Sequence, residues 1–313
     1  MGEPSASGPV PENHDEALAA LAAGRPSLVW RRLIADTETP VGAALKLFEP
    51  GRGDFLLESV EGGEVRGRYS LLGIDSDLVF RAGPGRCEIN RDWRRDRAAF
   101  APLAGDPLAE LRRLIAGCRI DVPAGLPPAL ACLVGYLGYE TVGLVEKLPR
   151  ATPNELGLPD MLFVRPGLIG VFDRLGDELY LVAPVWAEGP GEPMHKVEVA
   201  GERIDQALRR LALPAATMPA AARLPEPPEL TPTMPAAGYA AMVARAKAYI
   251  EAGDIFQVVL AQRFSCPFPL PPLALYRALR RVNPSPFLYL LDLPGFAVVG
   301  SSPEILSASA TTR

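Results

Sequence analysis

The chain has 313 residues, a length that corresponds to about two domains at roughly 150 residues each. Its hydrophobic content of 48% and charged content of 22% are typical of a globular protein and exclude a disordered or fibrous chain. The 32 basic and 37 acidic residues give a net charge of −5, and the basic residues are scattered, which argues against nucleic acid as a partner.

The chain begins with alternating short helices and strands. Its pattern predicts a helix over residues 17–23 that ends at Gly24, followed by a strand over 28–35. Thr39-Pro40 is typical of a helix start, and it predicts a helix over 41–47.

Polar residues gather at the end of the next apolar strand, which begins at residue 54. Glu58 and Ser59 close that strand, a glycine-rich loop follows, and Arg68 opens the next polar segment. Polar side chains at a strand end, together with backbone N–H and C=O groups that pair with no strand, can bind a small ligand. The residues alone favour the alternative, an ordinary long hairpin in which Arg68 pairs with Glu58 or Glu64.

The middle of the chain reads as antiparallel strands with few long helices. A hairpin is predicted from 78–80 to 86–89, and strands over 161–164, 167–173 and 179–182. This order favours an α+β fold over repeated β-α-β units.

Two shorter features interrupt these strands. Asp106-Pro107 predicts the start of a helix over 108–115 whose inner face carries Leu108, Leu111 and Ile115. Gly135 and Gly138 follow another strand, and we interpret them as positions of close packing, because the chain contains neither GxGxxG nor GxxxxGK[ST].

A segment rich in proline and alanine divides the chain. It follows a predicted helix over 197–211 and indicates a linker at 213–235. The predicted domains are therefore residues 15–212 and residues 236–313.

The second predicted domain opens with a helix that ends near Gly253 and a buried strand over 255–264. Gln257 lies on that strand between aliphatic neighbours, where an unpaired amide would cost about 1–3 kcal/mol. It therefore needs a ligand or, as the alternative, a backbone partner in the core.

The chain then shows a helix, a hairpin and a polar turn. A helix over 272–282 is predicted to stop at the proline pair of 283–286, and Asp292 to Gly295 is a hairpin turn between strands 287–291 and 296–299. Glu304 follows the second strand at a sheet rim. A general acid is common there, and a solvated glutamate is the alternative reading.

Three motifs of this last segment resemble a known family. Residues 253–260 (GDIFQVVL), 283–287 (NPSPF) and 300–304 (GSSPE) are similar to the opening of the chorismate-binding domain of the anthranilate synthase component I family. The resemblance implies that family's α+β fold, rich in antiparallel sheet, with the second sheet incomplete here. Isochorismate and salicylate synthases have a lysine base where Gln257 stands, so the glutamine indicates an enzyme that uses ammonia.

The resemblance also implies a reaction. Such an enzyme converts chorismate and ammonia to anthranilate and pyruvate, the first step of tryptophan biosynthesis, with ammonia supplied from glutamine by an amidotransferase subunit. Gln257 would orient the reactants and Glu304 would act as the general acid. Mg²⁺ is expected as the cofactor, held by residues of a C-terminal half that this chain lacks, so we expect a fragment that is inactive alone.

A regulatory site is implied as well. Leu57, Glu58 and Ser59 correspond to the family motif that holds the feedback inhibitor tryptophan, which in the family also touches the segment that maps onto Pro286, Phe287 and Leu288. Leu57, Phe287 and Leu288 would then form the indole slot. Glu58 would accept the ammonium, and Ser59 or nearby N–H groups would donate to the carboxylate.

Two other functions fit the same residues. The first is aminodeoxychorismate synthase component I, which shares the fold and the substrate but makes the para isomer. The second is a sensor of aromatic amino acids without enzymatic activity, built from the first domain.

Cysteine usage and hydropathy indicate the cytoplasm. The four cysteines (Cys87, Cys118, Cys132 and Cys266) have no CxxC spacing and no neighbouring histidine, which fits reduced thiols and disfavours zinc or a disulfide framework. The sequence has no apolar run of about 18 residues, so we expect no membrane span.

Overall fold

A computed structural model describes residues 13–61, 65–83, 85–123, 125–127, 130, 133–148, 153–214 and 228–304. The chain forms two compact units, a main unit of Met1–Ala216 with Pro272–Arg313 and a small unit of Thr217–Pro271. We describe each unit by itself.

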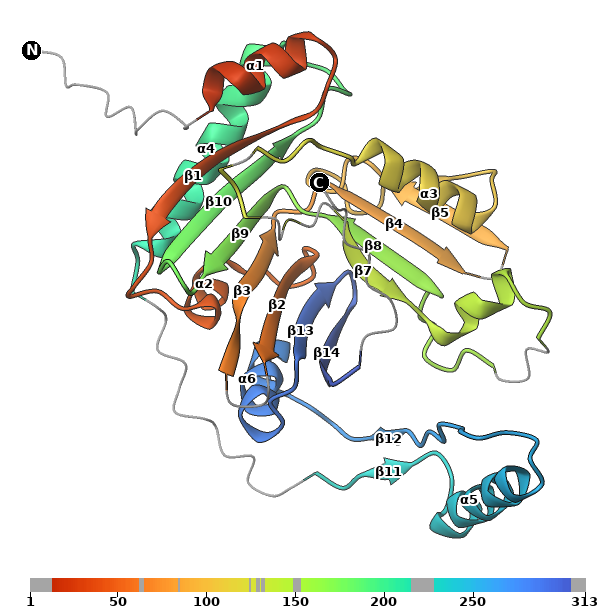
Figure 1. Cartoon of the computed structure of the whole chain (residues 1–313). Helices are drawn as coiled ribbons and strands as arrows, with labels where there is room; N and C mark the ends of the chain where they lie inside the picture. The colour runs from red at the N-terminus through yellow and green to blue at the C-terminus, as the bar shows by residue number, and fades with distance from the viewer. Residues whose placement is uncertain are drawn as a thin grey trace, which may run out of the picture. The chain divides into compact units, whose positions relative to one another are not determined.

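The main unit is built on a seven-stranded antiparallel sheet (Figure 1). Its strands, in spatial order, are β1 (Ser27–Ile34), β10 (Glu178–Val185), β9 (Leu168–Asp173), β3 (Val65–Ile74), β2 (Asp54–Glu61), β13 (Phe287–Leu293) and β14 (Phe296–Ser302). One face is covered by helices α1 (His14–Ala22), α2 (Pro40–Leu47), α4 (Pro193–Leu211) and α6 (Pro272–Val282).

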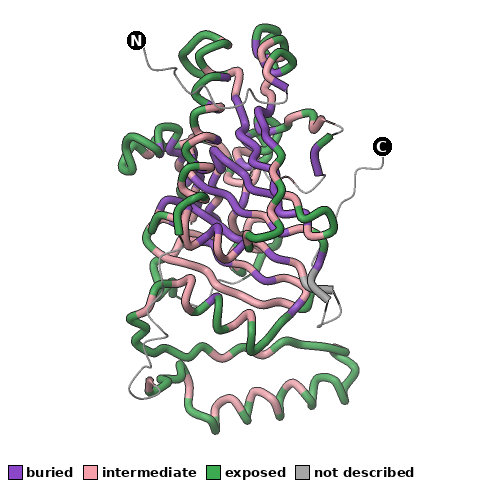
Figure 2. Tube along the Cα trace, turned by 90° about the vertical axis from the view of Figure 1, so that its left-hand side faces the viewer, coloured by how far each residue is buried: buried purple, intermediate pink, exposed green. Residues whose placement is uncertain are grey.

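A second antiparallel sheet packs against the other face. Its strands are β6 (Ala101–Pro102), β5 (Arg86–Asn90), β4 (Leu78–Gly83), β8 (Met161–Arg165) and β7 (Val134–Leu137). Phe55, Val79, Leu162 and Leu291 join the two sheets in one buried cluster. Helix α3 (Pro107–Gly117) covers the second sheet, and a 3₁₀ turn, η1 (Tyr139–Leu144), follows β7. Figure 2 shows the buried residues concentrated along the strands.

Local signals at the helix starts are confirmed. The Thr39 hydroxyl accepts a hydrogen bond from the N–H of Gly42 at 3.0 Å, and the Asp106 carboxylate accepts two from the first turn of α3. The inner face of α3 differs from the prediction, because Ile115 is 46% exposed while Leu111 and Leu114 are buried.

The predicted hairpin at the end of the chain is confirmed, and it extends the main sheet. Gly295, with a φ of 87°, makes the turn between β13 and β14, and β13 pairs with β2 from Asp292↔Asp54 to Phe287↔Ser59. The structural units therefore do not coincide with the predicted domain bounds of 15–212, 213–235 and 236–313, which remain a prediction about how the whole protein divides.

The small unit contains helix α5 (Ala236–Glu251) and a two-residue ladder between β11 (Thr231–Pro232) and β12 (Phe264–Ser265). The strand predicted over 255–264 is wrong: only Phe264 lies in a strand, and Phe256 is 98% exposed. An apolar, β-branched sequence forms a strand only when another strand pairs with it, and the described residues offer no partner before Phe264.

No helix in the described part of the chain is both long enough and apolar enough to cross a membrane.

The expected close packing at Gly135 can be tested by substitution. A methyl group at Gly135 would lie 1.9 Å from the carbonyl oxygen of Leu162 and 2.7 Å from the Cα of Phe163, on the neighbouring strand β8. Gly135→Ala should therefore lower the free energy of unfolding by about 1–3 kcal/mol, measured by urea denaturation. Gly117→Ala is the matched control, because a methyl group there meets nothing within 4 Å and alanine favours the helix. Equal stability of the two variants would refute this packing.

Candidate functional site

Strands β2 and β13 bring together the two segments that were predicted to bind one ligand. Ser59 pairs with Phe287, and Glu58 pairs with Leu288, although more than two hundred residues separate the partners in the sequence. Pro286 precedes β13 and is half-buried. The proximity of Ser59 to the 286–288 segment, which the ligand hypothesis requires, is therefore present.

The six predicted residues do not, however, line one slot. Successive side chains of a strand point to opposite faces of the sheet. Leu288 is 2% exposed and packs in the cluster under the helices, whereas Leu57 packs in the cluster between the two sheets. Glu58 belongs to the helix face, where it meets α6. The predicted combination of Leu57, Leu288 and Glu58 around one ligand is therefore corrected.

Ser59 lies where the pairing of β2 with β3 is irregular. The register shifts between the pairs Glu58↔Ser70 and Val60↔Arg66, so the extra residues lie on β3, opposite Ser59. A bulge bends the strand that carries the extra residues, here β3, and bulges are frequent beside binding sites. The Ser59 hydroxyl lies over Gly67 of β3, where a methyl group would come within 2.5 Å of it. Among the side chains that the structure describes, this hydroxyl has no hydrogen-bond partner.

Glu58 is the centre of a buried ionic cluster, the Glu58 cluster, which comprises Glu58, Arg174, Tyr276 and Arg280. The carboxylate oxygen Oε2 accepts from the Tyr276 hydroxyl at 2.6 Å and from Nε of Arg280 at 2.7 Å. The other oxygen, Oε1, accepts from Nη2 of Arg280 and Nη2 of Arg174, both at 3.0 Å. Glu58 is 4% exposed and Tyr276 is fully buried.

This cluster corrects the role predicted for Glu58. A carboxylate offers about four acceptor positions, and four donors already occupy those of Glu58. Burial, with the nearby Glu58 charge, raises the pKa of Tyr276. The phenol therefore stays protonated and donates a hydrogen bond to Glu58. An incoming ammonium would have to displace a guanidinium. Glu58 therefore holds α6 on the sheet and is not free for a ligand.

Sequence reasoning missed Tyr276 and Arg280. They lie four positions apart and so share a face of α6, which was the one available signal. Nothing local identifies Glu58 as their partner.

Within the described residues, Arg68 pairs with Asp173 and not with Glu58, the first of the two partners that the hairpin alternative offered. Its guanidinium binds the Asp173 carboxylate in a two-point contact at 2.9 and 2.7 Å, and Glu64 lies outside the described residues. The hydrogen bond from Arg68 lowers the pKa of Asp173, with burial opposing it.

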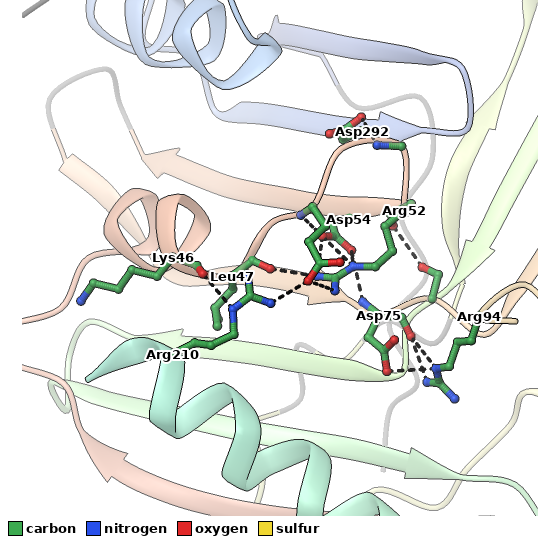
Figure 3. A network of polar contacts seen from close by, with 12 residues as sticks. Lys46, Leu47, Arg52, Asp54, Asp75, Arg94, Arg210 and Asp292 are labelled. Atoms are coloured by element: carbon green, nitrogen blue, oxygen red, sulfur yellow. Dashed lines mark hydrogen bonds and ion pairs between the residues drawn. The ribbon is translucent and has the colours of Figure 1, made fainter. Parts of the chain in front are cut away.

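A second polar network fixes the other end of the β2–β13 pair (Figure 3). Asp54, fully buried at the start of β2, accepts hydrogen bonds from Arg52 at 2.7 Å and from the N–H of Asp75 at 3.1 Å. Burial raises the pKa of Asp54 against the opposing effect of Arg52. The carbonyl of Asp292 on β13 accepts from the N–H of Gly53 at 3.0 Å. Both ends of the strand pair are thus anchored.

The two predicted catalytic residues lie in different units. Gln257 is exposed on an irregular segment of the small unit. Glu304 is exposed just after β14 in the main unit, and its N–H donates to Ser302 Oγ at 3.3 Å. Their catalytic roles therefore remain predictions.

The described residues offer no ready metal site. Within them, no group of three or more His, Cys, Asp or Glu side chains is arranged to hold an ion. Cys87, Cys118 and Cys266 are unpaired thiols, and Cys132 lies outside the described residues. We therefore derive no step through the expected Mg²⁺.

Comparisons with known proteins point to one family. Residues 56–310 match the model of the chorismate binding enzymes. The chain is 47% identical over 284 residues to anthranilate synthase component 1 of Cereibacter sphaeroides, an alignment that covers 91% of this chain and 57% of that protein. It is 40% identical over 283 residues to the Thermus thermophilus protein of the same name, covering 90% and 57%.

A solved structure agrees with these relatives. Anthranilate synthase component I from Streptococcus pneumoniae TIGR4 superposes with a TM-score of 0.63 at 26% identity, covering 76% of this chain and 51% of that one. The chain thus spans little more than half the length of the curated relatives it matches.

The Glu58 cluster predicts a large loss of stability when one donor is removed. Arg280→Met leaves the buried carboxylate without two of its four hydrogen bonds, which should cost about 3–5 kcal/mol of unfolding free energy in urea denaturation. Arg281→Met is the matched control, because Arg281 is exposed and has no ion pair among the described residues. Equal effects of the two substitutions would contradict the cluster.

Proposed function

The chain belongs to the family of chorismate-binding enzymes, and we propose that it is part of an anthranilate synthase component I, which converts chorismate and ammonia to anthranilate, pyruvate and water. The identity of 47% over 91% of the chain is the observation that carries this proposal. Because the chain spans 57% of that relative, the activity is proposed for a protein that also carries the remaining portion.

The proposed chemistry assigns roles to two residues of this chain. Gln257 orients the incoming ammonia or the ring substituents, because an amide cannot take up a proton near neutral pH. Glu304 donates a proton to the leaving 4-hydroxyl group. Both residues belong to motifs inside the family-matched region of 56–310.

Three other components complete the proposal. Ammonia comes from glutamine through an amidotransferase subunit. Mg²⁺ is bound outside the described residues, which do not offer a cluster for it. We also propose that the enzyme works in the cytoplasm.

We further propose that tryptophan binds beside Ser59, where the pairing of β2 with β3 is irregular, and inhibits the enzyme. Ser59 has a hydroxyl without a partner among the described side chains, and Phe287 lies opposite it on β13. Leu57 and Phe287 present apolar surface to the indole, with Pro286 beside them, while the Ser59 hydroxyl and backbone N–H groups donate to the carboxylate. Glu58 and Leu288 support these strands from the opposite face.

This arrangement provides a route by which bound tryptophan would affect the catalytic residue Glu304. Strand β13 continues through the Gly295 turn into β14, which ends at Ser302, two residues before Glu304. A ligand that contacts both Ser59 and Phe287 touches β2 and β13 together, so its binding energy depends on how the two strands are placed. A shift of β13 moves β14 with it and displaces Glu304.

A chimeric enzyme tests the proposed activity. In it, this chain replaces the corresponding part of the Cereibacter sphaeroides relative, and the parent relative is the control. With chorismate, an ammonium salt and Mg²⁺, we expect anthranilate, detected by its fluorescence, and we expect none from the 313-residue chain alone. An inactive but folded chimera, or one that makes only the para isomer, would contradict the proposal.

Ser59→Phe in the same chimera tests the regulatory site. The phenyl ring collides with Gly67 and fills the space beside Phe287, so the tryptophan concentration for half inhibition should rise at least about tenfold, a loss of roughly 1.4 kcal/mol of binding. Ser265→Phe on the exposed strand β12 is the matched control. Unchanged inhibition in Ser59→Phe, with normal activity, would exclude this site.

A further inference from the structure

A second candidate site lies beside the first half of α4, away from Ser59. It is a cavity of about 530 Å³, bounded by α4, by the end of β10 and by the loops that follow β3 and β5. We call it the α4 cavity. Its charged lining residues are Asp75, Asp77, Arg91, Asp92, Arg94, Arg95, Arg165, Glu188, Lys196 and Arg203.

The lining carries an excess of positive charge. It has six arginine or lysine side chains against four carboxylates, a net charge of +2 with His195 neutral, in a chain whose net charge is −5. Arg165 is neutralised by Asp77 in a two-point contact at 2.7 and 3.0 Å. Asp75 is shared between Arg94, at 2.9 Å, and Arg203, at 3.1 Å. One carboxylate therefore serves two guanidinium groups.

Lys196 does not contribute a free charge. Its ammonium donates to the carbonyl oxygens of Trp186, Ala187, Glu188 and Gly189 at 2.8 to 3.3 Å, so it holds the loop that precedes α4. The remaining cations are arginines. Arg91 and Arg95 are exposed at the rim and have no ion pair within the described residues.

Arg94 and Arg203 each keep an unused donor. Arg203 is 16% exposed, and its Nη1 donates to the Gly167 carbonyl at 3.0 Å while Nε faces Asp75. Arg94 uses Nε and Nη2 on Asp75, a contact visible in Figure 3. In the described part of the chain, Nη2 of Arg203 and Nη1 of Arg94 have no partner.

The pKa of Arg203 indicates that the α4 cavity has too little negative charge to balance its guanidinium groups. Burial, together with the nearby charge of Arg94, lowers the pKa of Arg203 to about 10, against the opposing effect of Asp75. The guanidinium remains charged at neutral pH. A ligand that brings negative charge would relieve this desolvated cation.

The start of α4 adds to the positive electrostatic potential of the cavity. Its N-cap residue, Glu192, makes no side-chain cap, so the first N–H groups of a 19-residue helix lack that partner. Gly189 and Gly191, with φ angles of 84° and 108°, form the turn that leads into the helix. The positive end of the helix dipole favours an anion at this end.

From these observations we propose that the α4 cavity binds a small phosphorylated metabolite, with the phosphate held by Arg94 and Arg203 and by Arg91 and Arg95 at the rim. Several guanidinium groups that line one cavity suit the three oxygens of a phosphate dianion better than a single carboxylate. The volume accommodates a small organic molecule, and Pro184 and Val185 provide apolar wall for its carbon skeleton. This site goes beyond the proposed function and does not depend on it.

Titration calorimetry of the 313-residue chain tests the site, with inorganic phosphate and glycerol 3-phosphate as probes at low ionic strength. Both should bind with dissociation constants below about 1 mM, weaken as sodium chloride is added, and bind more tightly than citrate. No binding of either phosphate up to about 10 mM, or equal binding of citrate, would overturn the proposal.

Two variants locate the binding. Arg203→Met removes the buried donor, and Arg91→Glu with Arg95→Glu reverses the rim charges without breaking any ion pair among the described residues; each should weaken phosphate binding at least about tenfold. Arg112→Glu, exposed on α3, is the matched control and should bind normally. If Arg203→Met fails to fold, the rim variant decides alone, and unchanged binding in the rim variant would place the ligand elsewhere.

Discussion

The stability of the main unit depends on the hydrogen bonds and ion pairs that compensate the buried charge of Glu58. A buried carboxylate is stable only when charged and hydrogen-bonding partners replace the water it has lost. Glu58 of β2 obtains them from Tyr276 and Arg280 of α6 and from Arg174 beyond β9. One side chain therefore fixes α6 against the sheet, and the strand that follows α6 enters the sheet beside β2.

This constraint separates two functions that the sequence motif had combined. Leu57, Glu58 and Ser59 are consecutive, but Glu58 points to the helix face, whereas the Ser59 hydroxyl lies over Gly67 of β3. Glu58 stabilises the packing of α6 on the sheet, and Ser59 offers, beside Phe287, a hydroxyl that has no partner among the described side chains. Substitutions at these neighbours should therefore produce different defects, one in stability and the other in ligand response.

The features that sequence could predict are those encoded within a few residues. The capping threonine at residue 39, the capping Asp106 and the Gly295 turn act on adjacent backbone, and all three are found as predicted. The motifs of the final segment likewise indicated the family that the comparisons identify. Gly135 was recognisable as a packing residue, although its contact on β8 was not.

The features that sequence could not predict all depend on distant partners. The pattern over 255–264 has strand composition, yet a strand also requires a neighbouring strand. Glu58 lies 218 residues from Tyr276, and Arg68 lies 105 residues from Asp173, so their pairing follows from strand order. The same limit applies to the α4 cavity, where the arginines of the loop after β5 meet Arg203 of α4 and Arg165 of β8 only in the fold.

Amide hydrogen exchange in the 313-residue chain tests most directly whether residues 272–302 fold as part of the main sheet. The account predicts that amides of β13, which lies between β2 and β14, open with the same free energy as those of β9 in the interior of the sheet. If β13 instead exchanged through local opening while β9 stayed protected, α6 and β13 would not be held on the main sheet, which would contradict the role given to the Glu58 cluster.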